Sequence, residues 1–144
     1  ARFQAAGLAP RFVGTEIGRA STIKMLRSVM VKGMEALTVE CFRAAARAGV
    51  AEEVANSLDA SEGGLGWAEQ TAYNMERMTA HGIRRAAEMR EVAKTLRGLD
   101  VAPVMTTGTI SWEEEMGALD LSLDSGTPLA EQLTLIEQAL EKGE

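Results

Sequence analysis

The sequence predicts an all-α fold of about six helices packed around one long N-terminal helix. Between residues 19 and 48 there is no proline, and apolar residues recur at intervals of three and four, the period of an amphipathic helix. Beyond this stretch, shorter segments with the same period alternate with glycine and proline. Residues 10–14 could form one edge strand, but its sheet would have to lie outside this chain.

The long helix is expected to end at Gly49 and to begin near Ser21 or Thr22, either of which could cap it, or one turn earlier. At about 1.5 Å per residue it would be roughly 45 Å long. Its other side also carries apolar residues, so we expect it to be buried between neighbours or to reach a second domain or subunit. The residues expected to face inward are Ile23, Leu26, Met30, Leu37, Cys41, Ala44 and Ala48.

The remaining helices are shorter and are separated by loops. Gly82 is expected to break or bend the chain, and Pro103 to mark a connector at 101–105. The loop at 57–66 contains Gly-Gly-Leu-Gly but lacks the spacing of a nucleotide-binding motif. Three consecutive glutamates at 113–115 predict a solvated face near a helix N-terminus. We expect these helices over residues 50–58, 67–80, 83–96, 109–119 and 127–143.

Composition excludes several classes of function. The chain of 144 residues has a net charge of −6 and only 4% aromatic residues, so a nucleic-acid surface is not expected. No apolar run approaches the ~20 residues of a membrane span. Cys41 is the only cysteine, which precludes an internal disulfide, fits the reducing cytoplasm and predicts a buried structural thiol. His81 is the only histidine, so a histidine-based metal site is not expected, and a capping or packing role near Gly82 is favoured for it.

A polar stripe runs along the long helix. Lys24, Ser28 and Lys32 follow one another at intervals of four residues, and Glu35 lies on the same stripe. Spacing alone favours a solvated face with a Lys32–Glu35 ion pair. The same spacing would also bring these side chains together if the helix lined a site.

The segment Gly18-Arg19-Ala20-Ser21-Thr22-Ile23-Lys24 resembles the start of the C-terminal helical domain of the β-hydroxyacid dehydrogenases, the superfamily of 3-hydroxyisobutyrate and 6-phosphogluconate dehydrogenases. Together with residues 31–37 and 81–89, it looks like the branch whose helical domain is labelled a domain of unknown function. The resemblance covers nearly the whole chain. It implies that residues 1–17 are the tail of a missing Rossmann domain and that residues 18–144 form the helical substrate and dimerisation domain.

The resemblance also implies an activity. The family transfers hydride between a small hydroxy acid and NAD or NADP, and the cofactor is bound mainly by the missing N-terminal domain. Lys24 would be the general acid and base; Ser28, Lys32 and Ser21 would bind substrate, and Arg85 would contact the cofactor. The family's glycine and asparagines are replaced by Ala20, Arg27 and Ser28.

The resemblance further implies that the domain forms a homodimer and that the isolated chain is inactive. Two other interpretations stay open: a dimerisation module without a catalytic role, and a stand-alone helical binding protein. The first is compatible with the catalytic interpretation, because this superfamily commonly dimerises through its helical domain. The second depends on whether a glycine-rich strand–turn–helix precedes the chain.

Overall fold

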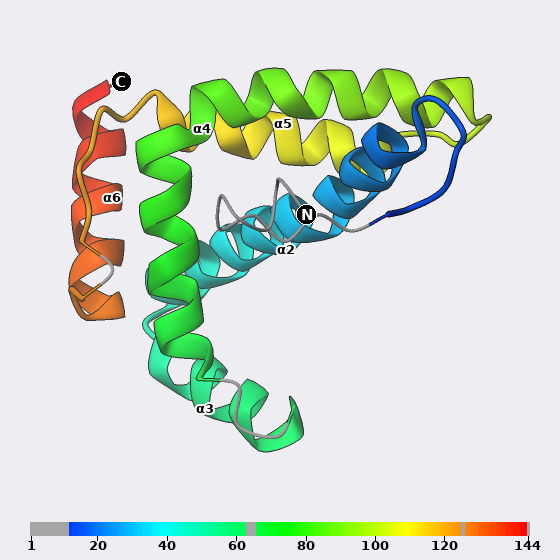
Figure 1. Ribbon diagram of the computed structural model, residues 1–144. Helices are drawn as coiled ribbons and strands as arrows, with labels where there is room; N and C mark the ends of the chain where they lie inside the picture. Colours follow the sequence, from blue (N-terminus) through cyan, green and yellow to red (C-terminus); the bar gives the residue numbers. More distant parts are fainter. Residues whose placement is uncertain (1–11, 63–65, 125, 144) are drawn as a thin grey trace, which may run out of the picture.

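The computed structural model describes residues 12–62, 66–124 and 126–143, and all regular secondary structure within these ranges is helical. Figure 1 shows the arrangement, in which α2 crosses α4 and α5 while α3 and α6 lie toward the C-terminal end of α2. The prediction of an all-α fold around one long N-terminal helix is confirmed. The helices are α2 Arg19–Ala48, α3 Ala51–Glu62, α4 Trp67–Gly98, α5 Val104–Gly117 and α6 Leu129–Gly143.

Two glycines with positive φ delimit α2. Gly18 (φ 89°) precedes the first turn, and Gly49 (φ 73°) ends the helix by donating its N–H to backbone carbonyls of the last turn. The expected end at Gly49 is therefore confirmed, and the helix begins at Arg19, which agrees with the earlier of the two expected starts. Ser21 and Thr22 lie inside the helix and do not cap it.

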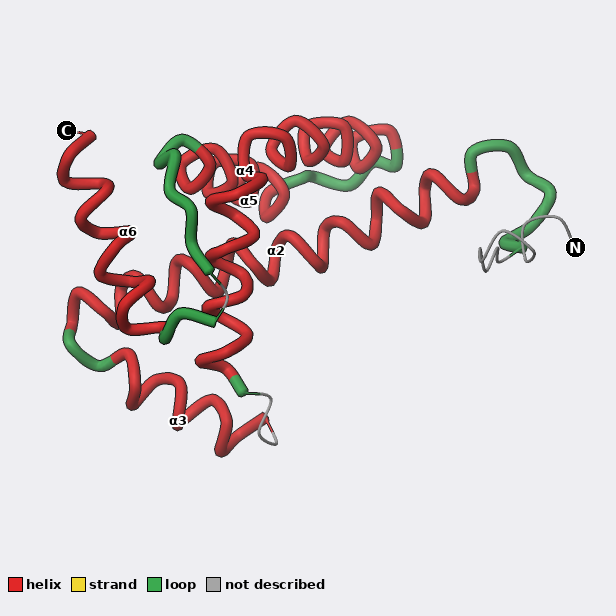
Figure 2. Tube along the Cα trace, turned by 60° about the vertical axis from the view of Figure 1, so that its left-hand side comes forward, coloured by secondary structure: helices red, strands yellow, loops and turns green. Residues whose placement is uncertain are grey.

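The two helices expected on either side of Gly82 are one continuous helix, α4, which accounts for the lower number of helices in the described ranges. Figures 1 and 2 both show this helix turning sharply along its length, so that it has two arms. Gly82 is buried where α4 meets α5: an added Cβ would lie 2.1 Å from the Glu113 carbonyl oxygen and 2.8 Å from the Gly117 Cα. The glycine thus allows close packing of two backbones and does not end the helix. His81 is exposed within the same helix and caps nothing.

Other boundaries differ from expectation by a few residues. Helix α3 continues to Glu62, so residues 57–62 are helical, while 63–65 of the expected loop lie outside the described residues. Helix α5 begins at Val104, because the backbone restriction from Pro103 falls on the residue before it and a helix can start directly after it. Residues 12–14, the described part of the expected edge strand, form no strand.

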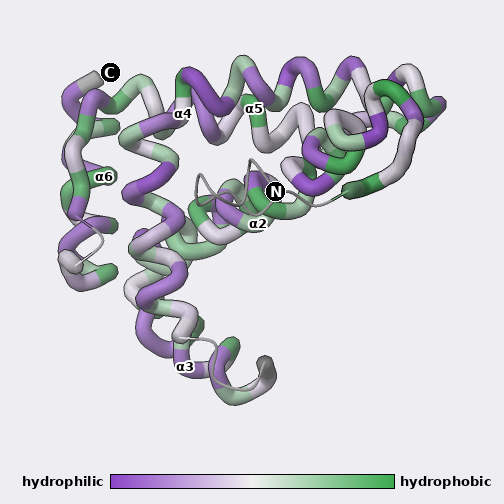
Figure 3. The backbone as a smooth tube through the Cα atoms, viewed as in Figure 1, coloured by the Kyte–Doolittle hydropathy of each residue, from purple (hydrophilic) through white to green (hydrophobic). Residues whose placement is uncertain are grey.

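The core uses the face of α2 that was expected to be secondary. Ala36, Val39 and Phe42 are buried against Met75 and Met78 of α4. The stripe expected inward is exposed: Leu37 and Met30 have 52% and 66% of their surface accessible, and Cys41 is also exposed. Figure 3 shows that hydrophobic residues occur along all of α2, which is why period alone did not identify the buried face.

The N-terminal half of α2 is held by a smaller contact. Met25 and Val29 pack against a cluster formed by Met89, Val92 and Leu96 of the C-terminal arm of α4. The first buried residue of α2 is Lys32. None of the described helices combines the length and hydrophobicity needed to cross a membrane.

Candidate functional site

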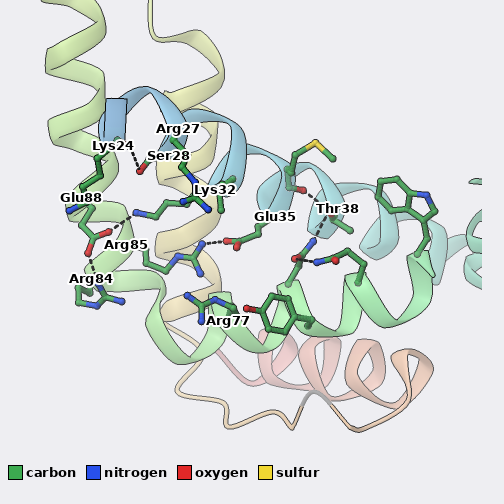
Figure 4. Close-up of a pocket in the computed structure, with 16 residues that line it drawn as sticks. Lys24, Arg27, Ser28, Lys32, Glu35, Thr38, Arg77, Arg84, Arg85 and Glu88 are labelled. Atoms are coloured by element: carbon green, nitrogen blue, oxygen red, sulfur yellow. Dashed lines mark hydrogen bonds and ion pairs between the residues drawn. The ribbon is translucent and has the colours of Figure 1, made fainter. Parts of the chain in front are cut away.

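A groove of about 770 Å³ lies between α2 and both arms of α4. Figure 4 shows the side chains that reach into it from the two helices. Basic residues dominate the lining: six are basic and only two, Glu35 and Glu88, are acidic. This excess of positive charge occurs in a chain whose net charge is −6, so the groove is suited to an anionic ligand. The basic residues are Lys24, Arg27, Lys32, Arg77, Arg84 and Arg85.

The structure brings most of the predicted site residues into this one groove. Lys24, Ser28 and Lys32 line it from successive turns of α2, and Arg85 lines it from α4. Lys24 is exposed and forms no ion pair with the described residues. The Ser28 hydroxyl donates a hydrogen bond to the Lys24 carbonyl oxygen at 3.0 Å. Ser21 is exposed and lies outside the groove lining.

Lys32 is anchored across the groove. Its Nζ lies 2.6 Å from Oε2 of Glu88 on α4, and the other oxygen of that carboxylate accepts a hydrogen bond from Arg84. The hydrogen bond from Lys32 and the nearby charges of Lys32, Arg84 and Lys24 hold the pKa of Glu88 below its ordinary value, against the opposing effect of burial. The expected Lys32–Glu35 ion pair is not formed, because Glu35 is paired with Arg85.

Beneath the groove lies a buried cluster of three charged residues, which we call the buried triad: Glu35 on α2, Arg85 on α4 and Glu113 on α5. Arg85, only 2% exposed, contacts the Glu35 carboxylate, and its Nε lies 3.1 Å from Oε1 of Glu113. Two carboxylates thus share one guanidinium. Burial raises the pKa of Glu113 to about 7, although the charges of Arg85 and Lys32 oppose the shift.

The triad corrects the expectation of a solvated glutamate run. Glu113 is fully buried near the C-terminal end of α5, while Glu114 and Glu115 pair with Arg90 and Arg43. The sequence indicated buried charges only through charged residues that lie among apolar ones on the inward faces of helices. The spacing of residues within each helix could not show which three charged side chains would meet in the buried triad.

The other end of the groove is uncharged apart from Arg77. Asn74 donates from Nδ2 to Thr38 Oγ1 at 3.2 Å and accepts from Gln70 Nε2 at 2.9 Å. The Arg77 guanidinium carbon lies 5.7 Å from the centroid of the Tyr73 ring, a cation–π contact. Sequence reasoning did not identify these residues as part of a site.

Comparisons with known proteins fit a domain of a longer protein. Residues 45–116 match the family described as "Domain of unknown function (DUF1932)". An uncharacterized 28.5 kDa protein in the 7S RNA 5' region of Methanothermus fervidus is 29% identical over 99 residues, which are 69% of this chain and 39% of that protein.

Two solved structures are also similar. A conserved hypothetical protein from Sinorhizobium meliloti 1021 has a TM-score of 0.83 and 32% identity, over 96% of this chain and 47% of that one. Conserved protein MTH1747, of unknown function and described as structurally similar to 3-hydroxyacid dehydrogenases, has a TM-score of 0.71 and 35% identity, over 81% of this chain and 45% of that one. The chain therefore spans less than half the length of these relatives.

Proposed function

The chain belongs to the DUF1932 family and has the all-α fold of a hydroxyacid-dehydrogenase-like helical domain, and from this premise we propose that it is the substrate-binding and catalytic half of an NAD(P)-dependent hydroxyacid oxidoreductase. One observation carries the proposal. Lys24, without an ion-pair partner among the described residues, opens into a groove with an excess of basic side chains. A groove with an excess of positive charge suits a small acid. The Lys24 amino group, which is not held in an ion pair with the described residues, is suited to proton transfer.

In this proposal Lys24 exchanges a proton with the substrate oxygen. When the substrate is oxidised, the Lys24 amine takes the hydroxyl proton; when the product is reduced, the ammonium returns it. The nicotinamide, when bound, supplies the hydride acceptor or donor. Because the Ser28 hydroxyl proton is already donated to the helix backbone, its oxygen is left to accept a hydrogen bond from the Lys24 ammonium and to hold that group beside the substrate oxygen.

The other predicted site residues are assigned to contacts with the substrate or the cofactor. Lys32, fixed by Glu88, would bind the substrate carboxylate, and Ser21, one turn before Lys24, would contact the part of the substrate outside the groove. Arg85 remains our candidate for a cofactor contact. Its present partners, Glu35 and Glu113, indicate that it first holds the groove floor in place.

The cofactor itself would be held mainly by a preceding Rossmann domain. The described residues contain no strand and thus no strand–turn–helix cradle for a dinucleotide phosphate, whereas the excess of basic side chains in their groove suits an acidic substrate. The coverage of less than half of the relatives is compatible with such an additional domain. The active site would then lie between the two domains, as ligand sites often do.

The test is made in the full-length protein with a panel of hydroxy acids and both cofactors. We expect Lys24→Met to lower kcat by about 10²- to 10⁴-fold, the usual contribution of a positioned acid or base, and to change the Kd of the cofactor by less than about twofold. Lys94→Met, which removes an exposed lysine of α4, is the matched control and should keep full activity. Turnover that survives Lys24→Met would refute the role of Lys24, and a wild-type protein that oxidises no hydroxy acid would refute the proposed function.

A second role is favoured by the exposed side of α2. The apolar residues expected inward form an exposed stripe, and we propose that a second copy of the chain covers it in a homodimer. Dimerisation and catalysis are compatible, since the stripe lies on α2 outside the residues that carry the proposed chemistry. The exposed stripe consists of Ile23, Leu26, Met30 and Leu37.

A further inference from the structure

The groove extends well beyond the reach of Lys24. Lys24 and Thr38 line it at opposite ends of the α2 contribution, which corresponds to about 21 Å of helix. A small hydroxy acid with its hydroxyl at Lys24 and its carboxylate at Lys32 would fill one end only. The rest of the groove, bordered by the N-terminal arm of α4, is left for a further part of the ligand.

Arg77 is the cation of this second end. The basic residues near the middle of the groove have carboxylate partners: Lys32 and Arg84 share the single charge of Glu88, and Arg85 lies in the buried triad. Arg77, in contrast, has no carboxylate partner among the residues that the structure describes, and its contact is the Tyr73 ring. Figure 4 shows Arg77 extending from α4 among the side chains that line the groove.

The geometry of this contact favours an oxyanion. A guanidinium placed over an aromatic ring keeps its in-plane N–H groups available for a carboxylate or phosphate, which it can bind with two parallel hydrogen bonds. The neighbouring wall is formed by uncharged side chains: Asn74 is 5% exposed and is hydrogen-bonded on both sides, to Thr38 and Gln70. No acidic side chain of this wall competes for Arg77 among the lining residues.

We propose that Arg77 and Tyr73 form a second anion subsite, so that the ligand of this groove is an extended hydroxy acid with an acidic group at each end. The first acidic group lies near Lys32 and Arg27, and the second, a carboxylate or a phosphate, lies at Arg77. The inference rests on the proposed function for the hydroxyl at Lys24. Its anion-binding part can be tested without turnover.

The binding test uses the full-length protein and calorimetry with two acids of equal length, adipate and hexanoate. We expect adipate to bind more tightly, and Arg77→Met to weaken adipate about 10- to 100-fold, the usual effect of losing a charge-assisted pair of hydrogen bonds, while hexanoate changes less than about twofold. Arg97→Met, an exposed arginine near the end of the same helix, is the matched control and should leave both affinities unchanged. Tyr73→Phe keeps the ring and should preserve adipate binding.

Two results of the binding test would overturn the subsite: equal affinity of the wild-type protein for the two acids, or an Arg77→Met variant that keeps the preference for adipate. Helical circular dichroism and thermal unfolding establish that the variant is folded. If Arg77→Met does not fold, the comparison of adipate with hexanoate on the wild-type protein still decides.

Turnover separates this inference from the proposed function. With 3-hydroxyadipate and 3-hydroxyhexanoate as substrates, Arg77→Met should raise KM about 10- to 100-fold for the first only, with kcat changed less than about threefold, since Arg77 binds and does not react. A rise in the KM of NAD or NADP with unchanged substrate KM would assign Arg77 to a cofactor phosphate and overturn the proposal. If neither acid is oxidised while adipate still binds through Arg77, the proposed function fails and the subsite stands.

Discussion

Replacement of Glu113 by glutamine should stabilise the protein at alkaline pH. Burial raises the pKa of this carboxyl to about 7 in the folded chain, against an ordinary value of 4.5 in the unfolded chain. The folded state therefore binds this proton more tightly, and the free energy of unfolding falls as the pH rises from 4.5 to above 7. At about 1.4 kcal/mol per pKa unit, the loss is at most about 3.5 kcal/mol. Glutamine keeps the shape and carries no charge, and it leaves Arg85 paired with Glu35 alone.

The assay is urea unfolding followed by helical circular dichroism at pH 5, 6, 7 and 8. Wild-type stability should fall by up to about 3 kcal/mol across this range, while Glu113→Gln should be nearly flat and the more stable protein at pH 8. The pKa values of Glu88 and Glu137 are lowered by their basic partners, so the stability that they contribute is lost only as the pH falls below about 4.5, outside this range. Glu114→Gln, whose carboxylate is 45% exposed and paired with Arg90, is the neighbouring control and should keep the wild-type slope. A Glu113→Gln variant less stable than wild type at pH 8 would refute the reasoning.

Two further substitutions test packing and assembly. Gly82→Ala should destabilise the fold by about 1–3 kcal/mol or more in the same urea assay, because its Cβ would collide with the α5 backbone. Gly108→Ala, at an open position inside α5, is the control and should be neutral or stabilising by up to about 1 kcal/mol. Equal stability of the two variants would contradict the close packing. Met30→Glu should shift sedimentation of the full-length protein toward the monomer, whereas Met105→Glu, at an equally exposed methionine on α5, should not. A dimer unaffected by Met30→Glu would exclude the exposed stripe as its interface.

The sequence predicted those parts of the fold that are local in the chain. The bounds of α2 follow from Gly18, Gly49 and the absence of proline between them, and the resemblance to the helical domain of hydroxyacid dehydrogenases is confirmed by the family match and by the solved structures. The predictions that failed depend on contacts between segments that are distant in the chain. The spacing of apolar residues shows that α2 has apolar faces, but it does not show which face meets α4. Leu37 and Cys41 were therefore expected in the core, whereas the structure exposes both.

The prediction for Gly82 also depended on a contact with a distant segment. A glycine within a helical pattern predicts a break unless a second backbone needs its space, and here that backbone is α5, about thirty residues further along the chain. The sequence did contain an indication of this close packing, because a second glycine, Gly117, lies at the same contact. The polar stripe of α2 did predict the α2 side of the groove, but the triad partners of Glu35 come from two other helices and no spacing rule joins them.

The projecting start of α2 also has a consequence for how the site is assembled. The turns that carry Lys24 and Ser28 rest on the small cluster around Met25 and Val29, and no side chain in them is fully buried. The free energy needed to open these turns locally is therefore lower than for the turns around Phe42. Whatever covers this end of α2 will order the lysine as well as shield it. In the proposed enzyme, docking of the Rossmann domain or of a second subunit would therefore be linked to the ordering of Lys24 in a single equilibrium.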